Sequence, residues 1–142
     1  MAQNVQKFRE IVFQLLYSRC FEGTIGELSL VMRQNAIPKK RAREAEKIVD
    51  TIWEKREELD QLIVAKAIGY ELERISRIER SILRLGLYEL LYTDLPDKVA
   101  ITEAIRLTRK FATAEGGSFV NALLDAIYKD RDEVISEKPV TC

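Results

Sequence analysis

Histidine is absent from the 142-residue sequence. Without an imidazole there is no Ser-His or Cys-His nucleophile pair and no histidine ligand for a metal, which excludes the commonest hydrolase and zinc chemistries. The sequence also lacks the glycine patterns that cradle nucleotide phosphates. Any catalysis would have to rest on carboxylates, lysines or tyrosines, and the sequence shows no visible catalytic apparatus and no motif for a cofactor or metal.

Cysteines and long apolar runs are scarce as well. Cys20 and Cys142 form no C-x-x-C motif and no disulfide framework, which fits a reducing cytosol. No apolar run approaches the roughly 18 residues of a transmembrane helix, and the N-terminus lacks the basic-then-apolar order of a signal peptide. We expect a cytoplasmic protein that does not associate with a membrane.

The chain has no net charge, because 23 Lys and Arg balance 23 Asp and Glu. Nucleic-acid binding usually draws on a basic patch, so any such patch must be local here. The positive charge is concentrated in the N-terminal third, and residues 124–138 are net acidic. The densest basic run of the sequence comprises Lys39, Lys40, Arg41 and Arg43. Two interpretations of this run stay open: it contacts phosphates, or it is a solvated first turn of a helix.

Apolar residues recur at three-and-four spacing along nearly the whole sequence, which is typical of amphipathic helices. The pattern predicts an all-α fold, a single domain over residues 1–142 with six to seven helices. We expect these helices at residues 4–20, 24–35, 39–69 as one long helix after Pro38, 76–92, from 98–102 to 111, and 118–129, with a frayed tail at 131–142. Arg56 and Asp60 are spaced to pair on the long helix, and Ser118 is expected to cap the last one after a loop at 113–117.

One segment has the pattern of a central helix. Ser76 and Glu79 form a capping box before ILRLGLYELLY, whose apolar residues fall on almost every side of a helix. Arg77, Arg80 and Arg84 make a polar stripe beside them. Structural ion pairing is the expected role of these arginines and ligand binding the alternative, with three acidic residues as candidate partners: Glu73, Glu79 and Glu89.

Three aromatic residues have two interpretations each. Phe119 follows Gly116 and Gly117, and it either stacks on an unpaired base or packs in the core. Tyr17 and Trp53 lie at the edges of apolar stripes, where such residues are core or interface anchors.

Four segments carry a family resemblance: REIVFQLLYS near the N-terminus, IERSILRLGLYEL in the central helix, P-x-K-V-A-I-x-E-A-I-x-L at Pro96–Leu107, and the Phe-Val-Asn sequence at Phe119–Asn121. Through these the chain resembles the NusB family of bacterial transcription antitermination factors over roughly residues 5–129. The resemblance implies two small helical bundles that share the central helix. It also implies a transcription antitermination factor that is not an enzyme and needs no cofactor. Such a factor binds boxA RNA together with NusE, a protein of the small ribosomal subunit, and so supports ribosomal RNA transcription by RNA polymerase.

The resemblance further implies two sets of site residues. The expected RNA-binding set is Gln3, Lys7, Arg9, Glu115, Ser118 and Phe119, and the expected NusE-binding set is Tyr17, Glu73 and Glu79. The chain departs from the family pattern at three points: only Lys7 and Arg9 are basic between residues 3 and 9, Ser118 replaces a common lysine, and Ala122 replaces a common glycine. Together with zero net charge, these departures predict weak RNA binding in the absence of NusE. The alternative function is a helical protein-interaction module that binds little RNA and forms a homodimer when free.

Overall fold

The computed structural model describes residues 2–20, 37–67 and 72–137. Its elements are α1 (Ala2–Ser18), α3 (Lys39–Glu54), α4 (Arg56–Lys66), the short 3-10 helix η1 (Leu72–Arg74), α5 (Arg77–Tyr92), α6 (Asp97–Phe111) and α7 (Ala114–Glu137). The described residues contain no strand, and the all-α prediction is confirmed. The helix expected at residues 24–35 lies outside the described residues.

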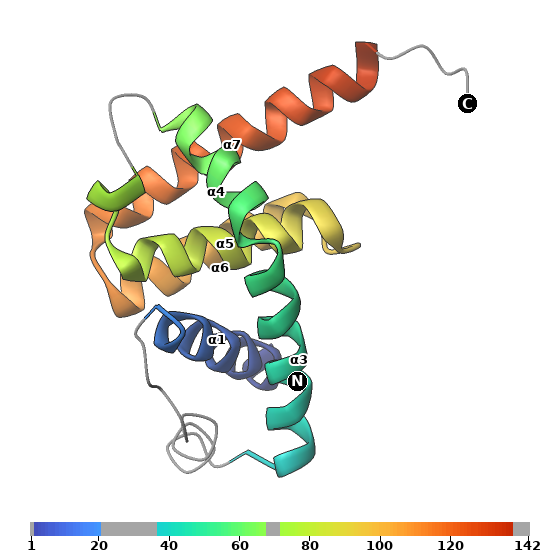
Figure 1. Cartoon of the computed structure of the whole chain (residues 1–142), viewed down its shortest axis with the longest axis vertical. Coiled ribbons are helices and arrows are strands. Elements are labelled where there is room, and N and C mark those ends of the chain that lie inside the picture. Colours follow the sequence, from blue (N-terminus) through green and yellow to red (C-terminus); the bar gives the residue numbers. More distant parts are fainter. Residues whose placement is uncertain (1, 21–36, 68–71, 138–142) are drawn as a thin grey trace.

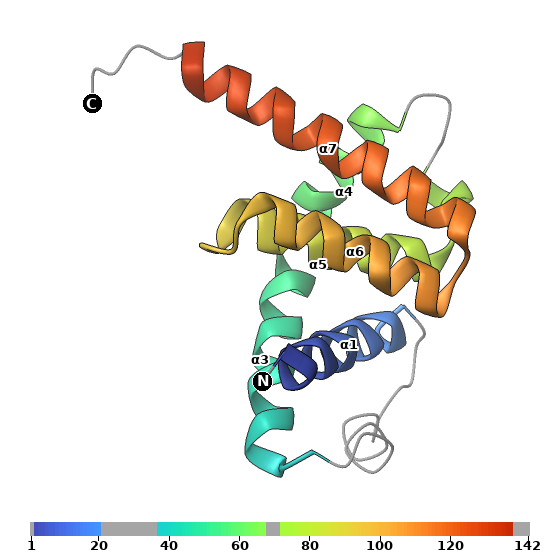
Figure 2. The same ribbon diagram turned by 180° about the vertical axis from the view of Figure 1, so that it is seen from behind.

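Helix α5 lies between two groups of helices (Figure 1). Helices α1 and α3 pack together on one side of it, α4 and α7 pack on the other, and α6 lies beside it, between α1 and α7. Seen from behind, α7 crosses in front of α4 and runs beside α6 (Figure 2). This arrangement confirms the expectation of two small bundles that share a central helix.

The all-round apolar character of α5 has a direct structural counterpart. Seven consecutive residues, from Ser81 to Leu87, are buried, which covers the full circumference of a helix. Ser76 caps the helix as expected, because its Oγ accepts a hydrogen bond of 3.1 Å from the backbone N–H of Glu79. Gly86 permits close approach of two neighbours, since a Cβ there would lie 3.1 Å from Leu124 Cδ1 and 3.4 Å from Ala104 Cβ.

The prediction of one long helix after Pro38 is wrong, because the segment forms two helices, α3 and α4, that are separated at Lys55. Lys55 has φ −91° and ψ 3°, and its N–H is shared between the carbonyls of Thr51 and Ile52. The bend lets α3 pack on α1 while α4 packs on α5 and α7 (Figure 1). A straight helix could not follow both surfaces, so tertiary packing overrides a continuous apolar stripe. The expected stop at Gly69 lies outside the described residues.

The expected start of the last helix is also wrong. Helix α7 begins at Ala114, and its cap is Thr113, whose Oγ1 accepts a hydrogen bond of 2.9 Å from the N–H of Gly116. Ser118 is instead an exposed residue inside the helix. The two glycines are buried helical residues rather than a loop, because α7 packs closely on α6 here. The backbone of α7 is helical through Glu137, which includes the first part of the expected frayed tail.

Candidate nucleic-acid and protein interface

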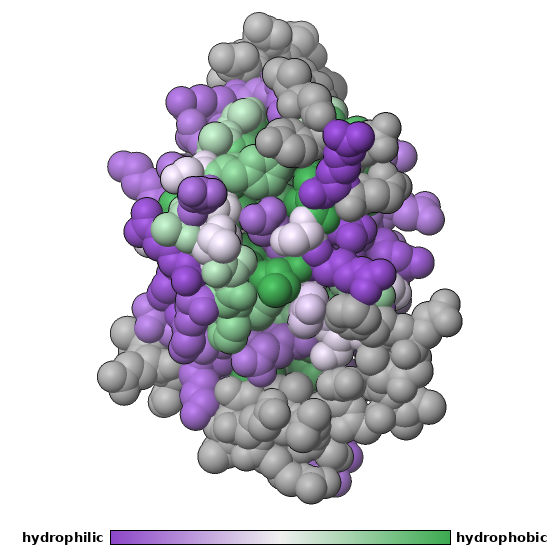
Figure 3. Space-filling view, turned by 90° about the vertical axis from the view of Figure 1, so that its left-hand side faces the viewer, coloured by the Kyte–Doolittle hydropathy of each residue, from purple (hydrophilic) through white to green (hydrophobic). Residues whose placement is uncertain are grey.

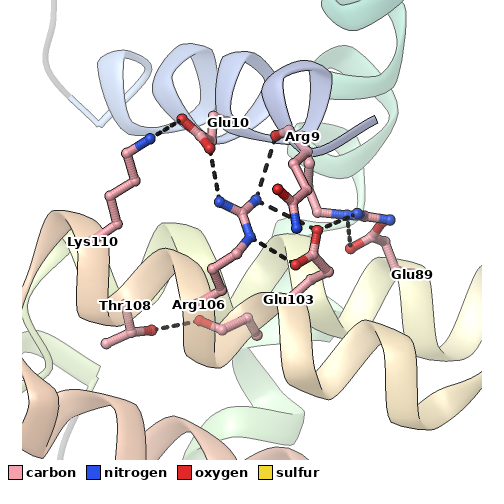
Figure 4. Close-up of polar contacts among 9 residues, drawn as sticks. Arg9, Glu10, Glu89, Glu103, Arg106, Thr108 and Lys110 are labelled. Carbon is pink, nitrogen blue, oxygen red and sulfur yellow. Dashed lines mark hydrogen bonds and ion pairs between the residues drawn. The ribbon is translucent and has the colours of Figure 1, made fainter. Parts of the chain in front are cut away.

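Arg9, expected to contact RNA, has its guanidinium inside the protein. The residue is 8% exposed, and its Nε lies 2.8 Å from Glu89 Oε2 on α5. Its Nη1 lies 2.7 Å from Glu103 Oε1 on α6. Because both bonds join buried or nearly buried charges, Arg9 ties α1 to the two helices beneath it (Figure 4).

Arg106 on α6 continues this network toward the surface (Figure 4). Its Nε lies 2.7 Å from Glu103 Oε2, and its Nη1 lies 2.7 Å from Glu10 Oε2 on α1. Lys110 completes the network with a contact of 2.8 Å from Nζ to Glu10 Oε1. Two carboxylates of α1 and α6 are thus each held by two cations, which orients α1 on the fold.

The network shifts the pKa values of its two outer carboxyls in opposite directions. Burial raises the pKa of Glu89 above 4.5, and the charge and hydrogen bonds of Arg9 offset this only in part. Burial also acts to raise the pKa of Glu10, but hydrogen bonds and charges from Lys110 and Arg106 outweigh it, so the pKa is lowered. The pKa of Arg106 is raised, because Glu103 and Glu10 overcome the effect of burial.

Lys7 is the exposed cation of α1 in the expected RNA-binding set. The basic run of α3 lies beside it, since the Arg41 guanidinium stands 3.9 Å from the centroid of the neighbouring Phe8 ring. All the cations of that run are exposed, and the first turn of α3 has no acidic residue. We call the basic surface the set Lys7, Lys39, Lys40, Arg41 and Arg43. The side chain of Gln3 lies outside the described residues.

The remaining residues of the expected RNA-binding set begin α7. Glu115 and Ser118 are exposed, whereas Phe119 is half-buried and packs against the hydrophobic core. Glu79 of the expected NusE-binding set lies against the same turn, because a Cβ on Gly116 would be 2.5 Å from its Oε1. The structure therefore brings Glu79 next to the residues of α7 that were expected to bind RNA, while the basic surface belongs to α1 and α3.

Tyr17, also expected to face NusE, is half-buried at the end of α1. Its ring stacks on Phe13 with centroids 6.2 Å apart and an angle of 22° between the planes. The centroid of the Phe13 ring in turn lies 5.0 Å from that of Phe111, so the side chain of Tyr17 packs against the hydrophobic core. The backbone of Glu73 lies in η1, and its side chain is outside the described residues.

The face that includes the start of α5 and the junction of α6 with α7 carries a band of apolar surface with hydrophilic side chains on both sides (Figure 3). A band of this kind with a polar rim is typical of protein interfaces.

None of the described helices is long and apolar enough to cross a bilayer. The described residues also contain no cluster of acidic residues and cysteine that could hold a metal ion.

An ion pair that the sequence did not indicate joins α4 to α5. Asp60 pairs with Arg84 through two bonds of 2.8 Å, from Nε to Oδ1 and from Nη2 to Oδ2. Burial acts to lower the pKa of Arg84, but the bond and charge of Asp60 raise it overall. The expected partner of Asp60, Arg56, instead donates to the carbonyl of Trp53 at 2.8 Å. The three-and-four spacing of the arginines on α5 was the available signal, and it did not specify Asp60.

The family model described as the NusB family matches residues 6–129 of the sequence. The chain belongs to the NusB family. A transcription antitermination protein NusB from Ruminiclostridium cellulolyticum is 35% identical over 124 residues, which cover 85% of this chain and 86% of the relative. The name of this relative describes a transcription antitermination protein, which agrees with the expectation that the chain is not an enzyme.

Solved NusB structures share the fold. The chain is similar to one in a crystal structure of antitermination factors NusB and NusE in complex with double-stranded RNA, with a TM-score of 0.77 and 31% identity over 92% of this chain and 99% of that one. NusB from Aquifex aeolicus, solved in solution, has a TM-score of 0.75 and 32% identity over 96% and 95% of the two chains.

Proposed function

We propose that this NusB-family protein binds boxA RNA together with NusE and supports transcription antitermination during ribosomal RNA synthesis. The observation that carries the proposal is the match to the NusB chain of a NusB and NusE complex with RNA, which extends over 92% of this chain. In this function the protein works in the cytoplasm and joins the RNA polymerase antitermination complex indirectly, through its two partners.

The basic surface is the proposed contact for RNA phosphates. Lys7 and the first turn of α3 offer exposed cations on two helices that pack together. Arg9 acts on this surface through its bonds to Glu89 and Glu103, which hold the helix that presents Lys7. At the start of α7, Phe119 offers a ring edge for a base, with Glu115 and Ser118 beside it, and Gln3 extends the set on α1.

NusE is proposed to bind near Tyr17, Glu73 and Glu79. Glu79 lies against the first turn of α7, so a protein bound there would adjoin the RNA-binding residues of that helix. The chain itself has no net charge. We therefore expect NusE to supply part of the positive surface for RNA, and we expect weak RNA binding without it.

The test is a titration of fluorescent boxA RNA with the protein alone, with NusE alone and with both, across a salt series. We expect the mixture to bind more tightly than either protein and its affinity to fall with salt. Lys7→Gln should weaken binding and reduce the slope of log affinity against log salt by about 0.7, the contribution of one phosphate contact on a single strand. Lys129→Gln, which removes the same charge from an exposed residue of α7, is the matched control.

An affinity that neither depends on NusE nor weakens with salt would overturn the proposal. Sedimentation of the free protein tests the alternative, a homodimeric interaction module. A dimer that covers Tyr17 and Phe119 and persists when NusE and RNA are added would favour that alternative.

A further inference from the structure

A cavity of about 660 Å³ opens where the end of α1, the bend between α3 and α4, and the first half of α5 meet. No residue of the proposed RNA-binding or NusE-binding sets lines it. Its volume lies within the range of protein binding pockets. The lining residues are Cys20, Trp53, Arg56, Glu57, Asp60, Ile75, Ser76, Arg77, Arg80 and Arg84.

Arginine dominates the walls of this cavity, with four guanidinium groups against two carboxylates. Asp60 accepts two hydrogen bonds from Arg84, and the remaining Arg84 nitrogen, Nη1, lies 4.0 Å from Cys20 Sγ. The Arg84 and Arg56 guanidinium groups lie 5.7 and 4.5 Å from the centroid of the Trp53 ring, so the indole is already stacked against cations. The lining as a whole therefore carries an excess of positive charge.

Arg80 indicates that the cavity is suited to an anion. Its Nε is buried and finds no hydrogen-bond partner among the described residues. A buried donor without a partner costs free energy, and the N-terminal half of a helix is an unfavourable place for a cation because that end of the helix dipole is positive. An anionic acceptor in the cavity would relieve both costs.

We propose that this cavity receives a carboxylate side chain from NusE. The proposal rests on the proposed function. Its position supports a protein ligand, because Cys20 lies less than one helical turn beyond Tyr17 and Arg80 directly follows Glu79. The guanidinium group matches a carboxylate in planar two-point geometry.

The distance from the basic surface supports a protein ligand over an RNA phosphate. Trp53, in the cavity wall, follows Arg43, the last residue of the basic surface, by ten residues of α3, which is about 15 Å along a helix axis. The carboxylates of Glu57 and Asp60 in the lining also leave a modest positive excess. That excess is sufficient for a single carboxylate.

Calorimetric titration of purified NusE into the full chain tests the proposal. Arg80→Gln should weaken NusE binding by about tenfold or more, since truncating one partner of a desolvated charge pair has a large effect on affinity. Lys129→Gln removes one positive charge at an exposed position of α7, outside both proposed binding sets, and should leave NusE binding unchanged. Circular dichroism of each variant checks the fold. If the Arg80→Gln variant does not fold, Arg77→Gln, a substitution at an exposed residue of the cavity lining, replaces it and should also weaken NusE binding.

A second measurement observes the contact itself. The Arg80 Nε–H resonance in a nitrogen-15 spectrum should shift when NusE is added, and one Asp or Glu to Asn or Gln substitution in NusE should abolish that shift. Equal NusE affinities of Arg80→Gln and wild type would overturn the carboxylate site while the proposed function stands. Weakened RNA binding with unchanged NusE binding would also overturn it, in favour of a phosphate. If wild type does not bind NusE, the proposed function itself fails.

Discussion

Arg9 donates a hydrogen bond of 2.7 Å to Glu103, although 94 residues separate them in the sequence. Their side chains are 9% and 10% exposed. The bond joins the first helix to α6, and Arg9 also reaches Glu89 on α5. The position of α1, and with it the exposed Lys7, therefore depends on a nearly buried ion pair.

The first prediction concerns this pair. Arg9→Ala should lower the free energy of unfolding by about 3 kcal/mol, because it leaves Glu89 without its cation and removes one of the two cations at Glu103. Lys7→Ala, two residues away and exposed, should change it by less than about 0.5 kcal/mol. Urea unfolding followed by circular dichroism measures both. Equal effects of the two substitutions would contradict the structural role of Arg9.

Local signals were sufficient to predict much of the fold. The cap at Ser76 and the apolar residues on every side of α5 depend on neighbouring positions, so both could be found in the sequence. The bend at Lys55 could not, because the apolar stripe continues through it and only packing on different partners separates α3 from α4. The glycines at 116 and 117 resembled a loop, but both lie in the first turn of α7, where contacts with other parts of the fold leave little room for a side chain at Gly116.

The candidate site was less predictable, because its geometry depends on distant residues. Arg9 looked like a surface cation, and its partners lie 80 and 94 residues away. The partner of Arg84 is Asp60 on another helix rather than an acidic residue on its own. The basic run at residues 39–43 could be counted in the sequence, but its position beside α1 depends on the packing of the buried face of α3 against α1.

The second prediction concerns the start of α7. Thr113→Ala should lower the free energy of unfolding by about 1 kcal/mol, because it removes the oxygen that accepts from the N–H of Gly116. Ser118→Ala should have little effect, since the residue is exposed within the helix and alanine has a higher helix propensity. Thermal unfolding of the two variants distinguishes them. A larger loss for Ser118→Ala would restore the cap that the sequence suggested.

The third prediction compares the two adjacent glycines. A Cβ on Gly116 would lie 3.0 Å from both Thr108 Cγ2 and Thr113 Oγ1, and it would displace the cap. Gly116→Ala should therefore destabilise the protein by about 1–2 kcal/mol, even though alanine favours a helix. A Cβ on Gly117 would meet Arg109 Cγ at 3.3 Å, and that long side chain can move. Gly117→Ala should be neutral or stabilising, and chemical denaturation of the pair checks the difference in sign.

The last prediction concerns two carboxyls of the ion-pair network, Glu10 and Glu89. The pKa of Glu10 is lowered in the folded protein, so its contribution to stability is present above the unfolded value of 4.5 and is lost as the pH falls through the folded value. Glu10→Gln should therefore cost about 1–3 kcal/mol near pH 7, where Arg106 and Lys110 lose a charged acceptor, and progressively less in acid.

Glu89 should behave in the opposite way, because its pKa is raised in the folded protein. Its contribution is fully present below 4.5 and is lost as the pH rises through the folded value, since deprotonation then becomes harder in the native state than in the unfolded chain. Relative to wild type, Glu89→Gln should gain stability between pH 4 and pH 7, whereas Glu10→Gln loses it. Urea unfolding of both variants at intervals across this range gives the two slopes, and slopes of the same sign would show that Arg9 outweighs the burial of Glu89.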